Sequence, residues 1–123
     1  MAQRWKRSLK SSRKPRSQRL YRIKAPMHIT RHNLNAHLSK ELRGKLKTRS
    51  LRVRKGDTVK IISGQFKGKS GTVERVVPGN AKIFIGGVEL VKKNGGKVQY
   101  PIVPSKVVII EIKEDKRRTT NAP

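Results

Sequence analysis

The sequence predicts a mainly β protein, a small barrel preceded by a long basic N-terminal extension that contains a short helix. From residue 53 onward, short β-rich runs alternate with Gly and Pro at a spacing of about 8–12 residues, which is typical of a small barrel or sandwich. The charge is unevenly spread, because residues 1–54 hold 18 Lys and Arg against a single acidic residue, Glu41. This step in charge near residue 54 indicates a boundary between an extension and a folded body.

The basic extension is predicted over residues 1–38. Its first part has few apolar side chains and a Lys or Arg at every second or third position. Ordering the backbone of one residue costs about 1–2 kcal/mol, which so little apolar surface cannot offset. We therefore expect residues 1–25 to be mostly disordered in the free protein, with a short helix around residues 5–12 forming when a partner binds. Residues 26–38 are expected to form an irregular connector.

A short helix is predicted over residues 39–47, inside a helix-and-connector segment of residues 39–54. Ser39 can cap the helix, and Glu41 lies in its first turn, where the helix dipole favours negative charge. Three leucines spaced four residues apart form one apolar stripe, which would dock the helix on the barrel. These leucines are Leu38, Leu42 and Leu46.

The barrel is predicted over residues 55–112, and residues 113–123 are expected to form a loose polar tail. The predicted strands cover residues 59–62, 72–77, 82–85, 88–93 and 107–112. A domain of about 60 residues buries only about 60% of the surface that its unfolded chain exposes. We therefore expect a weakly stable core, which a bound partner would strengthen through mass action.

The composition limits the class of partner. A formal net charge of +25 makes an isolated compact state repel itself, and a polyanion would supply the missing negative charge. Nucleic acid is the commonest such partner, and an acidic membrane surface is the second candidate. No apolar run approaches the roughly 20 residues of a membrane span, so none is predicted. The sequence contains no Cys, which excludes disulfides and the usual structural zinc sites.

Enzymatic and metal-binding functions have little support. The seven acidic residues are scattered, and no arrangement of Ser, His and Asp indicates catalysis. His28 and His32 have the i, i+4 spacing of helical metal ligands, but only His37 lies near as a third ligand. RNA contact or packing is the favoured reading of these histidines. We therefore expect no enzyme activity, no small-molecule substrate, no cofactor and no bound metal.

The most informative stretch, residues 53–76, has the pattern strand, glycine-rich loop, strand. Gly64 and Gly68 flank Phe66-Lys67 and permit positive φ angles, and a loop with bare backbone amides and two ammonium groups suits phosphate oxygens. We expect these two glycines to lie at the contact. Gly56 and Gly71 are expected only to let the chain turn tightly.

This stretch resembles a KOW motif, the strand–loop–strand unit of certain SH3-like barrels. Together with its flanking blocks, the chain from about Pro15 to Ile112 resembles the large-subunit ribosomal protein family numbered twenty-four in the universal naming and twenty-six in eukaryotes. The long extension is similar to the archaeal and eukaryotic form. The blocks that carry this resemblance are Ala25-Pro26-Met27-His28, His37-Leu38-Ser39-Lys40-Glu41-Leu42 and Arg49-Ser50-Leu51-Arg52-Val53-Arg54-Lys55-Gly56-Asp57.

The resemblance implies an SH3-like KOW barrel and a cytoplasmic, ribosomal protein of the large subunit. It also implies binding to large-subunit rRNA near its 5′ region, an early role in subunit assembly and a place beside the peptide exit tunnel. Neighbouring large-subunit ribosomal proteins would be further partners. Two alternatives are a KOW module that regulates transcription, which would normally have further domains, and a basic chromatin-type DNA binder, which leaves the Ser39–Leu42 block unexplained.

The residues predicted to bind rRNA lie in the extension, in the connector before the barrel, in the glycine-rich loop and in the last part of the fourth strand. Trp5 and Tyr21 have two open readings, stacking on exposed bases or packing on the barrel. The complete set is Arg4, Trp5, Lys6, Arg7, Arg13, Lys14, Arg16, Arg19, Tyr21, Arg22, Lys24, His28, Arg31, His32, Arg49, Arg52, Arg54, Lys55, Gly64, Phe66, Lys67, Gly68, Lys69, Lys92 and Lys93.

Overall fold

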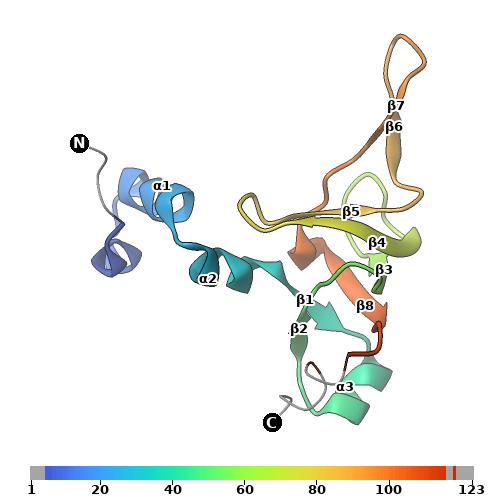
Figure 1. Cartoon of the computed structure of the whole chain (residues 1–123), viewed down its shortest axis with the longest axis horizontal. Helices are drawn as coiled ribbons and strands as arrows, with labels where there is room; N and C mark the ends of the chain where they lie inside the picture. Colours follow the sequence, from blue (N-terminus) through green and yellow to red (C-terminus); the bar gives the residue numbers. More distant parts are fainter. Residues whose placement is uncertain (1–4, 116–117, 119–123) are drawn as a thin grey trace.

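The computed structural model describes residues 5–115 and Arg118. It is mainly β, as predicted, and a helical N-terminal arm leads away from the strands (Figure 1). In chain order the elements are η1 (Arg7–Ser11), α1 (Pro15–Lys24), α2 (Met27–Thr30), η2 (Arg31–Leu34), β1 (Asn35–Leu38), α3 (Lys40–Leu46), β2 (Ser50–Arg52), β3 (Thr58–Ile61), β4 (Ser70–Val77), β5 (Lys82–Ile85), β6 (Glu89–Val91), β7 (Lys97–Gln99), η3 (Pro104–Lys106) and β8 (Val107–Glu111).

Six strands form one mixed sheet in the order β2-β1-β8-β3-β4-β5. All neighbours are antiparallel except β1 and β8, which run parallel. The sheet curls into a barrel-like shape because the chain after β7 returns to β5 and then continues into β8. Ile83 and Ile102 exchange backbone hydrogen bonds of 2.8 and 2.9 Å at this closure. The small barrel predicted from the sequence is therefore confirmed.

The core lies inside this curled sheet and is made almost entirely of branched aliphatic side chains. They come from alternate positions of the strands, as the period of two in a half-buried strand requires. The fully buried members with the largest volumes include Leu38, Ile61, Ile83, Ile85 and Ile109. Because β1 and its neighbour β8 both contribute such residues, the body of the fold includes a strand from the predicted extension.

Residues 26–38 do not form the irregular connector predicted from the sequence. They hold α2, η2 and β1, and Ala36 and Leu38 of β1 are buried in the core. The strand is only four residues long and has alternating burial, so its apolar pattern is too short to stand out in the sequence. Pairing with β2 on one side and β8 on the other makes it a strand.

The sequence missed the ten-residue helix α1 in the arm, and the short helix expected around residues 5–12 is the 3₁₀ turn η1. Pro15 is the first residue of α1, a position where its fixed φ fits and its missing N–H costs nothing. Arg22 and Lys24 lie in the last turn, where cations are favoured, and Pro26 follows two residues later. These local signals favour a helix, but the segment has too few apolar residues to show a clear helical period.

The predicted helix after β1 is confirmed as α3, with Ser39 as its N-cap. The Ser39 hydroxyl accepts a hydrogen bond of 3.4 Å from the Leu42 N–H, and Glu41 lies in the first turn. Leu42 and Leu46 are half-buried and pack against the core, as the apolar stripe predicted. The third member of that stripe, Leu38, belongs to β1 instead of the helix.

The strands of the barrel agree closely with the sequence. The predicted strand over 82–85 is confirmed residue for residue, and β3, β4 and β8 differ from their predictions by one to two residues at their ends. The predicted strand over 88–93 is shorter, since β6 covers only Glu89–Val91. The sequence missed β7 because three residues with one apolar side chain, Val98, are too few to show an alternating pattern; β7 is a strand because it pairs with β6.

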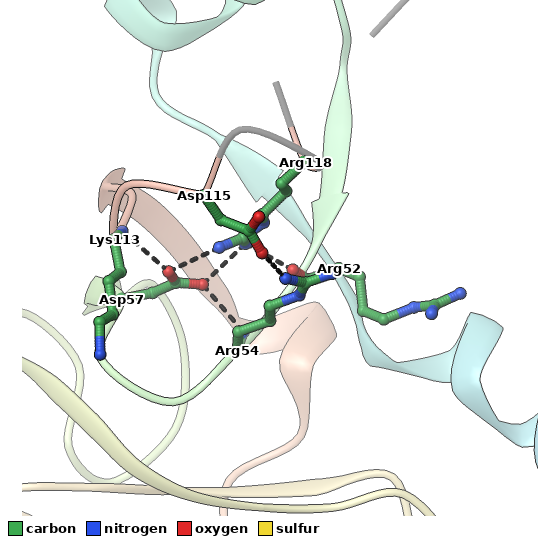
Figure 2. A network of polar contacts seen from close by, with 6 residues as sticks. All are labelled: Arg52, Arg54, Asp57, Lys113, Asp115 and Arg118. Atoms are coloured by element: carbon green, nitrogen blue, oxygen red, sulfur yellow. Dashed lines mark hydrogen bonds and ion pairs between the residues drawn. The ribbon is translucent and has the colours of Figure 1, made fainter. Parts of the chain in front are cut away.

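The chain after β8 was expected to be a loose tail, and at Arg118 this expectation is wrong. The Arg118 side chain is 4% exposed and forms an ion pair with Asp57, whose side chain is fully buried. Figure 2 shows Arg118 reaching the Asp57 carboxylate from one side, while the backbone of Arg54 and Lys113 reaches it from others. The other predicted tail residues from 116 onward lie outside the described part of the chain.

Candidate nucleic-acid interface

The predicted RNA-binding residues are spread over three parts of the molecule. One group lies in the arm, a second on and near the β3–β4 loop, and a third at the turn between β6 and β7 (Figure 1). The arm and the β6–β7 hairpin project from the barrel in different directions in this view. Arg4 lies outside the described residues.

The arm is organised by an aromatic pair and by one amide side chain. The rings of Trp5 and Tyr21 lie 5.5 Å apart between centroids and are tilted by 40°. Gln18 donates hydrogen bonds to the carbonyl oxygens of Lys10 at 2.9 Å and Ser12 at 2.6 Å. These contacts hold η1 against α1. Of the two readings for the aromatic residues, packing on the barrel is wrong, because Trp5 and Tyr21 pack on each other.

Almost all cationic side chains predicted in the arm are exposed. Since Pro15–Lys24 buries no residue, the surface of α1 consists mainly of solvated charge. The predicted RNA-binding residues of the arm that are exposed are Lys6, Arg7, Arg13, Lys14, Arg16, Arg19, Arg22, His28, Arg31 and His32, and Lys24 is half-buried. Such a surface offers many positive charges to phosphate groups.

The β3–β4 loop is closed by backbone hydrogen bonds at its base. The Gly68 N–H donates to the Ile61 carbonyl and the Ile61 N–H to the Lys69 carbonyl, both at 2.9 Å. Gly64 and Gly68 have φ angles of 101° and 89°, the left-handed region that glycine adopts without strain. A Cβ at either glycine would meet no atom within 4 Å, so their role in the fold is the turn of the backbone.

The loop presents lysine side chains instead of bare amides. The N–H groups of Lys67, Gly68 and Lys69 donate to carbonyls of Gly64, Ile61 and Phe66. The expectation that these three amides are free to bind phosphate is therefore wrong. The groups that the loop presents to an anion are the exposed ammonium groups of Lys67 and Lys69. The reason is that the tight loop satisfies its own backbone, as buried or half-buried turns usually do.

Phe66 holds the loop to the barrel. Its side chain is 9% exposed, its ring packs 5.1 Å from that of Tyr100, and the Lys69 ammonium lies 5.2 Å above its centroid. A buried ring is not available for stacking on a base. The contacts of Phe66 position the loop that carries Lys67 and Lys69.

Four predicted cations before β3 differ in the contacts that their side chains make. Arg54 forms an ion pair with Asp115 at the surface, and Lys55 is exposed beside it. The Arg52 side chain points away from the Asp57 cluster, while its carbonyl accepts a hydrogen bond from Arg118 (Figure 2). Arg49, between α3 and β2, is exposed. Of these four residues, Arg49, Arg54 and Lys55 are therefore the exposed ones.

The remaining predicted cations, Lys92 and Lys93, lie at the tip of the β6–β7 hairpin and are exposed. The hairpin pairs only with itself, so it forms a two-stranded sheet of its own. Gly95, with a φ of 82°, and a hydrogen bond of 2.8 Å from the Lys92 N–H to the Gly96 carbonyl close the turn. The tip thus carries charge away from the barrel.

The sequence did not single out three residues that the structure brings together with predicted ones. Lys10, Gln18 and Asn33 come from η1, α1 and η2 and line a cleft together with Tyr21 and His28. Nothing in their local pattern marks them, because each is one polar residue among many in the arm. Only the tertiary arrangement of η1, α1 and η2 places them on a common surface.

Two further searches of the described residues concern membranes and metals. In the described part of the chain no helix has the length and apolar content needed to cross a bilayer. Among residues 5–115 and Arg118, no cluster of three or more His, Cys, Asp or Glu side chains could hold a metal ion.

Comparison with known proteins identifies the family. The model of the family of ribosomal proteins called L26 in eukaryotes, with their archaeal counterparts numbered twenty-four, matches residues 12–121, nearly the whole chain. A curated protein of Methanospirillum hungatei, named "Large ribosomal subunit protein uL24", is 47% identical over 108 residues, which cover 87% of this chain and 90% of that protein. With its β barrel and basic arm, the chain belongs to this archaeal and eukaryotic family of ribosomal proteins.

Proposed function

We propose that the chain binds large-subunit rRNA through its basic arm, the β3–β4 loop and the β6–β7 tip. As a member of its family it is a structural constituent of the large ribosomal subunit in the cytoplasm and not an enzyme. Membership of this family also decides against the transcription-factor and chromatin readings. What remains to be tested is the contact with rRNA and its place in the subunit.

The observation that carries the proposal is the exposed charge of the arm. Almost all of its described Lys and Arg side chains face solvent, and Glu41 in α3 is the single acidic residue among residues 1–54. Such a surface would repel itself unless a polyanion neutralised it. Each phosphate that a cation neutralises releases counterions, and this release supplies much of the binding free energy.

The location follows from the resemblance to the family. We propose that the bound rRNA lies near the 5′ region of the large-subunit molecule and that the chain joins early in assembly, beside the peptide exit tunnel. The arm and the β6–β7 hairpin project away from the barrel, so these two extensions can contact separate rRNA helices at once (Figure 1). Neighbouring large-subunit ribosomal proteins would be further partners.

Filter binding tests the proposal with the full-length chain and transcripts of the large-subunit rRNA. We expect the 5′ portion to bind more tightly than the 3′ portion and than an unrelated RNA of equal length, at the same salt concentration. Equal affinity for all three RNAs would reduce the interaction to nonspecific attraction between opposite charges. An order-of-addition reconstitution, in which late addition lowers the yield of subunits, tests the early role.

A further inference from the structure

The arm contains a cleft that its charge alone does not explain. The cleft has a volume of about 780 Å³ and lies between η1 and α1 on one side and α2 and η2 on the other. Its walls are Arg7, Lys10, Gln18, Tyr21, Arg22, Ala25, His28, Ile29, His32 and Asn33. This volume falls within the range of roughly 300–1,000 Å³ that is typical of sites for small organic ligands. The cleft is therefore too small for a duplex and large enough for one nucleotide.

The residues that line the cleft fall into two chemical groups, one apolar and aromatic and the other cationic. Tyr21, Ala25 and Ile29 are half-buried and offer apolar and aromatic surface. The cations Arg7, Lys10 and Arg22 are exposed, and none of the described lining residues is acidic. A site that pairs a ring with several cations and excludes carboxylates suits a planar ligand that carries a phosphate.

Rigid neighbours hold the aromatic wall in place. Trp5 packs on Tyr21, at 5.5 Å between ring centroids, so the Tyr21 ring is supported on one side. Gln18, another wall residue, is bonded to the carbonyls of Lys10 and Ser12 and thus ties η1 to α1. A cleft built from two joined elements loses little conformational entropy when a ligand enters.

We propose that this cleft takes up one unpaired nucleotide of the rRNA, with its base against Tyr21 and the two histidines and its phosphates on Arg7, Lys10 and Arg22. This inference rests on the proposed rRNA binding and makes it specific for a structural feature of the RNA. An unpaired nucleotide enters at low cost because it is already unstacked, whereas a paired one would first have to leave its duplex. His28 and His32, one helical turn apart, flank the base.

Two arginines of α1 provide a matched test. Arg19 and Arg22 are both exposed and lie one turn apart on the same helix, but only Arg22 lines the cleft. Arg19→Glu and Arg22→Glu change the net charge equally, so they weaken the general attraction to RNA equally. His32→Ala adds a variant that removes no Lys or Arg side chain.

The measurement is base-specific chemical modification of large-subunit rRNA bound to each full-length variant, together with the affinity of each complex. In the wild-type complex we expect at least one unpaired nucleotide whose base is protected. Arg22→Glu and His32→Ala should abolish this protection, while Arg19→Glu keeps it at saturating protein. Loss of a stacked base should make the affinity of His32→Ala about tenfold weaker than that of the wild type.

Three results would overturn the inference. One is protection confined to paired nucleotides, and another is the same footprint for the wild type, Arg22→Glu and His32→Ala. The third is a complex that binds the rRNA tightly and protects no base, which would leave the proposed rRNA binding intact. If the chain failed to bind the rRNA at all, the proposed function and the cleft would fall together. Circular dichroism spectra that match the wild type verify the fold of each variant.

Discussion

Arg118 and Asp57, which lie 61 residues apart in the sequence, form a bidentate ion pair that is buried from solvent. The Nη1 and Nη2 atoms of Arg118 each lie 2.7 Å from one carboxylate oxygen of Asp57. The same oxygens accept the N–H groups of Arg54 at 2.9 Å and Lys113 at 3.2 Å. One carboxylate therefore joins the turn before β3, the chain after β8 and the chain near the C-terminus (Figure 2).

Removing this carboxylate should destabilise the barrel strongly. Asp57→Ala leaves the buried Arg118 guanidinium without a counter-charge and two backbone N–H groups without their acceptor, and breaking a buried pair from one side costs about 3–5 kcal/mol. Chemical denaturation of the full-length chain measures the free energy of unfolding. Combining Asp57→Ala with Arg118→Leu should recover part of the loss, because the second change removes the unpaired charge. Equal stability of Asp57→Ala and the wild type would show that the pair contributes nothing.

The arm should control the salt dependence of RNA binding. Each phosphate contact contributes about 0.7–0.9 to the slope of log K against log salt. Deleting residues 1–24 removes ten Lys and Arg, so we expect a much flatter slope while the barrel stays folded. Titrations at several salt concentrations, with far-ultraviolet circular dichroism as the check on folding, measure this. Identical slopes for the truncated and full-length chains would assign the RNA contact elsewhere.

Charge reversal in the β3–β4 loop should weaken binding without unfolding. Lys67→Glu with Lys69→Glu places two carboxylates where the loop offers ammonium groups, and we expect the affinity for rRNA to fall by at least about tenfold. Lys67 alone is the cleaner site, because Lys69 also lies over the Phe66 ring.

The matched control for the loop is Lys40→Glu with Lys45→Glu on α3. Both residues are exposed, and neither was predicted to contact RNA. This variant has the same net charge as the loop variant, so any difference in affinity between the two reports position instead of total charge. A native circular dichroism spectrum with unchanged rRNA affinity for the loop variant would leave the loop with a purely structural role.

Two glycines should respond to alanine in opposite directions. A Cβ on Gly71 would lie 2.5 Å from the Gly86 carbonyl oxygen, where β4 passes β5, so Gly71→Ala should lower the free energy of unfolding by about 1–3 kcal/mol. Gly44, inside α3, has open space where a Cβ would lie, and Gly44→Ala should raise the free energy of unfolding by about 0.4–1 kcal/mol. Thermal or urea denaturation compares the two. A stable Gly71→Ala variant would mean that the strands can separate slightly.

The glycine result also refines the sequence analysis. Gly71 was expected only to permit a tight turn, and it lies instead inside β4, opposite Val59 of β3. Glycine is needed there because two backbones approach closely, which is a relation between segments far apart in the chain. By contrast, the positive φ of Gly64 and Gly68 belongs to the loop itself, and the local pattern of the loop predicted it.

Patterns that act over a few residues were enough to predict much of this protein. Short β-rich runs between Gly and Pro residues predicted β3, β4, β5 and β8, and Ser39 with Glu41 predicted α3. The excess of Lys and Arg predicted a polyanionic partner, because the net charge is the sum over all residues and does not depend on the fold. The glycine-rich stretch and its flanking blocks were sufficient for the family, which the comparisons confirmed.

Only the tertiary structure decided what depends on contacts between distant segments. Strands β1 and β7 exist because they pair with other strands, and neither has a long enough apolar pattern to be recognised alone. The ion pair of Asp57 with Arg118 and the cleft in the arm likewise join residues that the sequence separates. The physical reason is that strand pairing and burial require two segments to meet in space, whereas a sequence pattern describes only one segment.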